Sequence, residues 1–462
     1  MTQAYRIESD LLGEKQVPVA AYYGVQTQRA LDNFDISNHK LYHYPDFIKA
    51  LAIVKKAAAM TNFDLKELDA NIYEAIAKAC DALLTGQYDQ AFPIDLYQGG
   101  AGTSTNMNAN EVIANVALEF MGYAKGDYQH CSPNDHVNLS QSTNDAYPTA
   151  LKLAIWEMNK SLCQQLSLLE NSLAKRAEAF KEVIKMGRTQ LQDAVPMSLG
   201  QEFSGFAHLI KMAQKDLKYS ASTLLEVNMG ATAIGTGINA PKQFDTVCAA
   251  HLAQLIDAPV TATEHLVAAT SDTSSFVEYS NALKKLCLKL TKICNDLRLL
   301  SSGPRTGLFE INLPQRQPGS SIMPGKVNPV IPEVVNQVCY KVIGNDLTVT
   351  LASENAQLQL NVMEPIITVS IFESIDLLKK AISTLVEECI VGITANAEHC
   401  KLQVQNSVGI VTALNPHIGY KKSTVIAKEA LATGKSIYEI VLAQGLLTKE
   451  QLDDILDAKH MI

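Results

Sequence analysis

The sequence lacks the features that mark membrane proteins, secreted proteins and nucleic-acid-binding proteins. No window approaches about 18 consecutive apolar residues, so no membrane-spanning helix is expected. The first ten residues contain no apolar core and do not resemble a secretory signal peptide. No lysine- and arginine-rich run is present and the net charge is −9, which argues against a nucleic-acid partner.

Cysteine patterns are missing as well. The nine cysteines are scattered, none forms a Cys-x-x-Cys motif, and none pairs with histidine at the spacing of a zinc finger. We therefore expect a cytoplasmic protein with reduced thiols, no structural zinc and no metal site. Internal repeats and low-complexity segments are also absent, and hydrophobic residues make up 47% of the chain, as in a globular protein.

Long helical patterns fill the middle of the chain. Apolar residues recur there at steps of three and four, which predicts helices over 150–185, 200–226, 274–301, 331–353 and 357–395, the last kinked at Pro365. In 274–301 a heptad seam runs beside a row of small residues, which favours a bundle over a two-stranded coiled coil. We predict a mainly α fold with a central bundle of five long helices, part of whose apolar surface is buried against other subunits.

Changes in composition divide the chain into three predicted domains. Residues 1–141 form a mixed, mostly helical N-terminal domain, with helices expected over 47–60, 70–85 and 112–121. Residues 142–397 form the helix-bundle domain, and residues 398–462 a small C-terminal helical domain.

Three polar clusters lie next to predicted helices, at 98–108, 141–146 and 187–196. The first is a glycine-rich turn that opens a helix, an arrangement that binds anions through free backbone N–H groups. It has neither the Gly-Lys-Ser/Thr of a P-loop nor Gly-x-Gly-x-x-Gly spacing, so a carboxylate fits better than a phosphate. Ordinary capping of the helix is an alternative, and a nucleotide site at 99–104 is another.

A fourth polar segment, residues 319–329, reads Gly-Ser-Ser-Ile-Met-Pro-Gly-Lys-Val-Asn-Pro. Glycines give this loop backbone freedom, and prolines restrict it at other points. Between them lie two hydroxyls, one cation and one amide, which together suit a small dianion. The alternative is a simple connector whose serines cap the next helix.

These four segments together closely resemble the aspartase/fumarase superfamily, and residues 319–329 match its signature over their whole length. The resemblance covers nearly the whole chain and is strongest to the aspartase branch. It implies a three-domain helical subunit and a homotetramer with a twenty-helix core. It also implies active sites shared between three subunits. The implied reaction is the reversible conversion of L-aspartate to fumarate and ammonia without a bound cofactor; some members are activated by a divalent cation such as Mg²⁺.

The resemblance also assigns roles to individual residues. Ser320 matches the catalytic base, which removes a Cβ proton and so forms an aci-carboxylate intermediate. The α-carboxylate is matched by Thr189, Lys326 and Asn328, and Asn144 lies where the amino group is expected. The residues that match the surroundings of the β-carboxylate are Thr103, Ser142, Thr143 and Ser321.

One position departs from the pattern of many members. Gln190 stands where they have a histidine, and Glu333 stands where they have that histidine's carboxylate partner. Glutamine cannot donate a proton as an acid, whereas an α-ammonium group already carries its proton, so Gln190 favours loss of ammonia over loss of water. Glu333 either hydrogen-bonds Gln190 or serves as a surface or helix-capping residue. The rival functions are a class II fumarate hydratase and a non-catalytic oligomeric scaffold.

Overall fold

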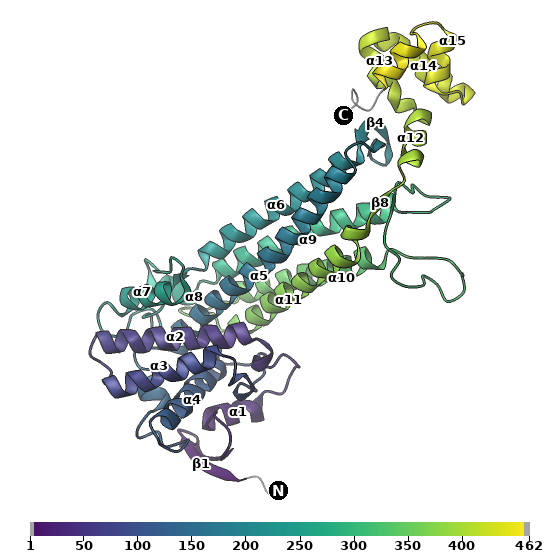
Figure 1. The fold of residues 1–462 in the computed structure, drawn as a ribbon. Helices are drawn as coiled ribbons and strands as arrows, with labels where there is room; N and C mark the ends of the chain where they lie inside the picture. The colour runs from purple at the N-terminus through teal and green to yellow at the C-terminus, as the bar shows by residue number, and fades with distance from the viewer. Residues whose placement is uncertain (1–3, 457–462) are drawn as a thin grey trace. The chain divides into compact units, whose positions relative to one another are not determined.

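The computed structural model describes residues 4–456, and the fold is mainly helical, as predicted (Figure 1). The chain forms two compact units, each assembled from three segments. Unit 1 comprises Met1–Leu162, Asp216–Lys285 and Lys341–Leu377. Unit 2 comprises Cys163–Lys215, Leu286–Tyr340 and Leu378–Ile462. In the described part of the chain, no helix is both long enough and apolar enough to cross a membrane.

Five long helices contribute residues to both units, which confirms the predicted set of bundle helices. They are α5 (Thr143–Ala179), α6 (Leu199–Thr223), α9 (Ser274–Leu300), α10 (Val330–Glu354) and α11 (Glu364–Glu388). The predicted kink at Pro365 is wrong. The helix begins at Glu364, so the proline lies in the first turn, where its missing N–H has no helical partner to lose.

In unit 1, helices α2, α3 and α4 lie side by side (Figure 1). The ring of Phe47 on α2 meets Tyr147 and Phe372 edge-on, with centroids 5.5 and 5.3 Å apart, and these aromatic contacts are part of the core. Helix α4 begins nine residues before its predicted start, at Thr103. The other elements of unit 1 are β1 (Tyr5–Asp10), β2 (Gly13–Pro18), α1 (Val25–Asn33), η1 (Leu41–His43), α2 (Pro45–Asp64), α3 (Ala70–Leu84), η2 (Asp89–Ala91), α4 (Thr103–Phe120), η3 (Pro133–Val137), β5 (Glu226–Val227), α7 (Phe244–Ile256), β6 (Thr261–Ala262) and α8 (Leu266–Ser271).

Unit 2 contains an antiparallel hairpin that the sequence patterns did not predict. Strands β3 (Ile184–Thr189) and β4 (Gln192–Ser198) form it, so helix α5 ends before residue 185. Met186 of this hairpin belongs to the same apolar core as Ile426 and Leu452 of the C-terminal helices. The remaining elements are β7 (Ile311–Asn312), η4 (Ile390–Gly392), β8 (Thr394–Ala395), α12 (Ala397–Asn406), η5 (Val408–Ile410), α13 (Val411–Ile418), α14 (Tyr420–Thr433), α15 (Ile437–Ala443) and α16 (Lys449–Ile455).

Candidate active site

A glycine-rich turn in unit 1 places Thr103 at the start of α4. Gly100, Ala101 and Gly102 all have positive φ, at 88°, 55° and 89°. A Cβ at residue 102 would lie 2.3 Å from the ring of Tyr147, so only glycine fits there. The exposed Thr103 hydroxyl donates to the Gly100 carbonyl at 2.6 Å, which occupies its one hydrogen.

The second polar cluster forms the N-terminus of α5, seven residues before the predicted start of this helix. Ser142 Oγ accepts a hydrogen bond from the Asn144 N–H at 3.2 Å, while the Ser142 N–H donates to Asp145 at 2.9 Å. This reciprocal capping satisfies two backbone donors. The hydroxyl hydrogen of Ser142 takes no part in this capping, so it can be donated to an anion.

Asp145 connects this helix end to the glycine-rich connection at 228–237. Its Oδ2 accepts from the backbone N–H groups of Thr232 at 2.8 Å and Gly230 at 3.2 Å. Asn144 Nδ2 donates to the Ala233 carbonyl at 2.7 Å. Asp145 is fully buried, and this burial raises its pKa to about 6 despite these donors. Asp145 and the 228–237 connection were not predicted from the sequence as supports of these residues; the Asn-Asp pair in the first turn of the helix was the available signal.

In unit 2, Thr189 and Gln190 lie at the tip of the β3–β4 hairpin, and both are exposed. Gln190 and Leu191 make the two-residue turn with φ of 54° and 61°, a conformation that side chains other than glycine, asparagine and aspartate rarely adopt. Strain of this kind persists at functional sites where the surroundings enforce it. A buried ion cluster holds the adjoining strand β3: Glu310 pairs with Lys185 at 2.7 Å and with Arg188 at 2.5 Å.

The segment 319–328 is a loop closed at its base. The Gly319 N–H donates to the Lys326 carbonyl at 2.7 Å, and Asn328 Nδ2 donates to the Gly319 carbonyl at 2.8 Å. A Cβ at residue 319 would lie 2.7 Å from the Lys326 carbonyl oxygen, so the closure requires glycine. Asn328 therefore uses one amide hydrogen within the loop and keeps the other.

Inside this loop, Ser320 Oγ accepts two backbone hydrogen bonds. The N–H groups of Ile322 and Met323 lie 3.2 and 3.1 Å from it. Donors aimed at an oxygen favour its anionic form, so this arrangement lowers the free energy of a serine alkoxide. Ser321 and Lys326 are exposed on the same loop.

Glu333 lies in the first turn of α10, where a carboxylate interacts favourably with the helix dipole. Its N–H donates to the Pro329 carbonyl at 3.3 Å. Within residues 4–456 of one chain, no hydrogen bond joins the Glu333 and Gln190 side chains. Both interpretations of Glu333 therefore stay predictions.

The predicted site residues fall into two groups by unit. Unit 1 holds Thr103, Ser142, Thr143 and Asn144, and unit 2 holds Thr189, Gln190, Ser320, Ser321, Lys326, Asn328 and Glu333. Each group is held by supports within its own unit. Among the described residues, no group of three or more histidine, cysteine, aspartate or glutamate side chains is placed to hold a metal ion.

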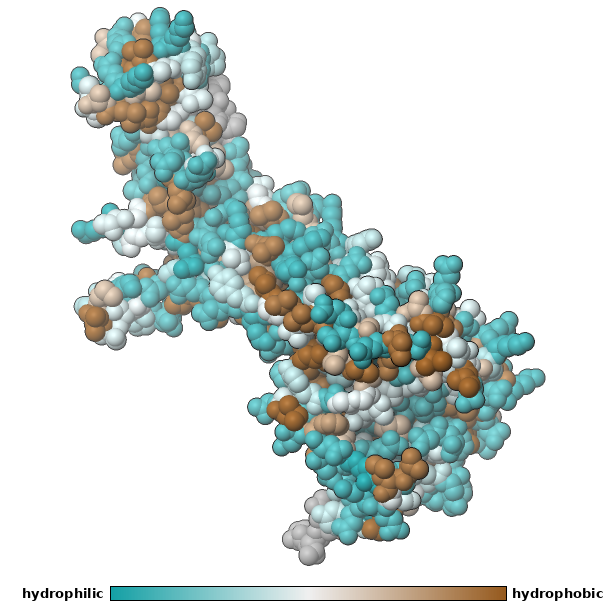
Figure 2. All heavy atoms as spheres, turned by 180° about the vertical axis from the view of Figure 1, so that it is seen from behind, coloured by the Kyte–Doolittle hydropathy of each residue, from teal (hydrophilic) through white to brown (hydrophobic). Residues whose placement is uncertain are grey.

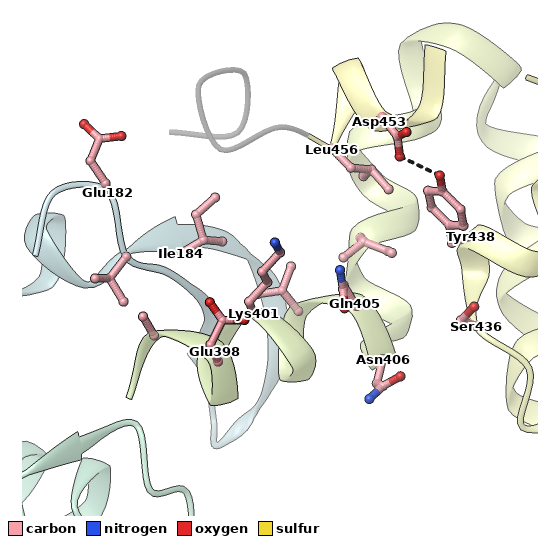
Figure 3. A pocket seen from close by; sticks show the side chains of 14 residues that line it. Glu182, Ile184, Glu398, Lys401, Gln405, Asn406, Ser436, Tyr438, Asp453 and Leu456 are labelled. Atoms are coloured by element: carbon pink, nitrogen blue, oxygen red, sulfur yellow. Dashed lines mark hydrogen bonds between the residues drawn. The ribbon is translucent and has the colours of Figure 1, made fainter. Parts of the chain in front are cut away.

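A cavity of about 750 Å³ in unit 2 contains none of these residues (Figure 3). Glu182 and Ile184 from the start of the hairpin, Lys401 from α12 and the C-terminal helices line it. Its polar lining mixes both charges, and the Tyr438 hydroxyl already donates to Asp453 at 2.5 Å (Figure 3). The cavity is separate from the predicted site residues.

Comparisons with known proteins identify the family of this chain. A lyase family model matches residues 13–344, and a model of the fumarase C C-terminus matches residues 410–462. The chain belongs to the aspartase/fumarase superfamily of lyases. The aspartate ammonia-lyase of Escherichia coli K12 is 54% identical over 100% of this chain and 97% of its own length. That of Helicobacter pylori 26695 is 55% identical, over 99% and 98% of the two chains.

Solved structures of this superfamily have the same fold. The fumarate lyase:delta crystallin from Brucella melitensis, bound to cobalt, superposes with a TM-score of 0.96 at 50% identity, covering 99% of both chains. The class II fumarase from Schistosoma mansoni superposes with a TM-score of 0.92 at 36% identity, also covering 99% of both. The relatives in this superfamily thus include proteins named as aspartate ammonia-lyases and a protein named as a class II fumarase, the two lyase activities that the sequence analysis gave as alternatives.

Proposed function

We propose that this chain is an aspartate ammonia-lyase that interconverts L-aspartate with fumarate and ammonia. Relatives of that name are 54% and 55% identical over essentially the whole length. The observation that carries the chemistry is Ser320 Oγ, which accepts two backbone N–H bonds within a loop closed on itself. This geometry supports a serine alkoxide as the base.

The reaction begins when the Ser320 alkoxide takes the proton from Cβ of aspartate. The C–H electron pair moves onto the β-carboxylate and produces an aci-carboxylate with one additional negative charge. This electron pair then forms the C=C bond as the C–N bond breaks, and the ammonium group leaves as neutral ammonia. Ser320 must lose the captured proton before the next turnover.

Stabilising the aci-carboxylate is the difficult part, because a carbon next to a carboxylate is a very weak acid. Preorganised hydroxyl and N–H donors are effective at this task. Thr103, Ser142, Thr143 and Ser321 are proposed to surround the β-carboxylate. The capping bond leaves the hydroxyl hydrogen of Ser142 unused, whereas Thr103 must first give up its bond to Gly100.

The α-carboxylate and the amino group require a separate set of contacts. Lys326, Asn328 and Thr189 are proposed to hold the α-carboxylate, and Asn144 to lie near the amino group. Gln190 favours ammonia loss because its amide cannot protonate a departing hydroxide. The strained turn at Gln190 and Leu191 supports a role for this hairpin tip in the site.

We further propose a cytoplasmic homotetramer whose active sites each take residues from three subunits. Helix α10 exposes Tyr340, Leu347 and Leu351 along one face, and they are 58%, 59% and 50% accessible in the single chain. Hydrophobic side chains also gather over the long helices on the face shown in Figure 2. An apolar stripe of this kind is usually covered by another subunit. We propose no resident cofactor, and the donors named above all come from the protein. Activation by a divalent cation such as Mg²⁺ can be tested by titrating the cation into the assay of aspartate turnover.

The purified protein tests this function directly. Incubated with L-aspartate, it should raise the absorbance at 240 nm as fumarate forms, and L-malate should give a far smaller rise. A strong signal with malate alone would make the protein a fumarate hydratase. If an intact tetramer gave no absorbance change with either substrate, a non-catalytic scaffold would be favoured.

A further inference from the structure

Buried polar side chains in unit 1 form a hydrogen-bonded chain that ends at Thr143. Lys55 on α2 begins it: this side chain is fully buried, and its Nζ donates to Asn138 Oδ1 at 3.0 Å and to Gln141 Oε1 at 2.9 Å. Asn138 Nδ2 donates to the Gln141 carbonyl at 3.2 Å. The orientation of the Asn138 amide is therefore fixed from both sides, with its oxygen facing Lys55 Nζ.

The orientation of Asn138 fixes the orientation of Asn106 on α4. Asn106 Nδ2 lies 3.2 Å from Asn138 Oδ1 and 3.2 Å from Thr143 Oγ1, and its two hydrogens serve these two acceptors. A flipped Asn106 would place its carbonyl oxygen against that of Asn138. Asn106 is buried and Asn138 is half-buried.

The bond from Asn106 determines whether the Thr143 hydroxyl acts as a donor or as an acceptor toward other groups. Its hydroxyl oxygen accepts from Asn106, so its own hydrogen must point elsewhere, and the described residues offer no acceptor for it. We propose that Asn106 is a positioning residue, which forces Thr143 to act as a donor toward the substrate carboxylate. This inference rests on the proposed function, because it specifies how one of the β-carboxylate donors is held.

The direction of this bond matters most in the transition state. A hydroxyl that is free to rotate spends part of its time with a lone pair facing the carboxylate, which repels the charge that builds there. When the hydroxyl is held as a donor, it does not have to rotate as negative charge develops on the carboxylate. Loss of the lock should therefore lower kcat more than it changes KM.

The test is a double-mutant cycle with a matched control on the same helix. Asn106→Ala is measured in the parent and in a Thr143→Val background, using fumarate formation from L-aspartate. The control is Asn110→Ala. Asn110 is also buried on α4 and its Nδ2 donates to the same Asn138 oxygen at 3.0 Å, but it makes no bond to Thr143. Native mass and thermal unfolding identify the folded variants.

Asn106→Ala should lower kcat about 10- to 100-fold with less than a threefold change in KM. In the Thr143→Val background the same change should cost less than about threefold, and Asn110→Ala should cost little in either. Equal losses in both backgrounds, or an equal loss from Asn110→Ala, would overturn the inference.

Asn106→Asp provides a second variant of the same size should the alanine protein not fold. Its carboxylate can only accept, so it reverses the bond to Thr143. We expect a similar loss of kcat that again disappears with Thr143→Val, and a loss that persists there overturns the inference. A parent that makes no fumarate from aspartate refutes the proposed function and this inference together. An active parent with additive losses refutes this inference alone.

Discussion

The closed base of the 319–328 loop can be opened with one methyl group. In Gly319→Ala the new Cβ would lie 2.7 Å from the Lys326 carbonyl oxygen and 2.9 Å from the Asn328 backbone nitrogen. The two chain segments at the base of the loop must therefore separate. This movement removes the bonds from Gly319 N–H to Lys326 and from Asn328 Nδ2 to Gly319. Ser320 then loses the frame that aims it.

The size of the effect follows from those two bonds. At about 1 kcal/mol each, their loss shifts the loop equilibrium by about 2 kcal/mol, or roughly thirtyfold. We expect kcat/KM for L-aspartate to fall about 10- to 30-fold in the absorbance assay at 240 nm. The thermal unfolding midpoint should move by less than about 2 °C, because the loop is exposed and opens locally.

A neighbouring substitution serves as the control. Pro318 is exposed and precedes the closure, so Pro318→Ala should leave kcat/KM within about threefold. If Gly319→Ala is as active as Pro318→Ala, the loop does not need its closed base and the reasoning about Ser320 loses its support.

Three further predictions concern the hairpin tip, the assembly and a buried carboxylate. Gln190→His should add measurable dehydration of L-malate while aspartate turnover changes by less than about tenfold; no gain with malate would remove the proposed basis of reaction choice. Leu347→Asp places a charge on the exposed stripe of α10 and should lower the native mass below that of four chains, whereas an unchanged tetramer would exclude this stripe from the interface. Burial raises the pKa of Glu364 to about 8 from its ordinary value of 4.5, so folding takes up a proton and stability falls as pH rises between these values. At about 1.4 kcal/mol per pH unit, Glu364 should lower the unfolding free energy of the parent by up to about 2 to 3 kcal/mol between pH 5.5 and 7.5. Glu364→Gln should abolish this part of the pH dependence, and identical urea curves for parent and variant would contradict the prediction.

The long helices were predictable from sequence because their packing leaves a periodic pattern. The heptad seam predicted 274–301, and α9 spans Ser274–Leu300. The start of α4 was not predictable in this way. Its first turns carry Thr105, Asn106, Asn108 and Asn110, which look like solvent-facing residues but are buried. Buried polar side chains satisfied by a tertiary network leave no hydrophobic period to detect.

The β3–β4 hairpin was missed for a related reason. A two-residue turn with positive φ is usually announced by asparagine or glycine, and here Gln190 and Leu191 occupy both positions. Strand β3 is also held by a distant partner, because Lys185 and Arg188 pair with Glu310, which lies over a hundred residues further along the sequence. The proposed site residues stand out in the sequence as polar clusters. Their hydrogen-bond directions required the structure.

The central claim is that the Ser320 oxygen, held by two backbone N–H groups, removes the Cβ proton. The most direct measurement is the turnover of L-aspartate by Ser320→Ala, with native mass recorded on the same sample. We expect a loss of at least about 10³-fold in kcat from an intact assembly. An intact Ser320→Ala protein that retains activity within tenfold of the parent would contradict it.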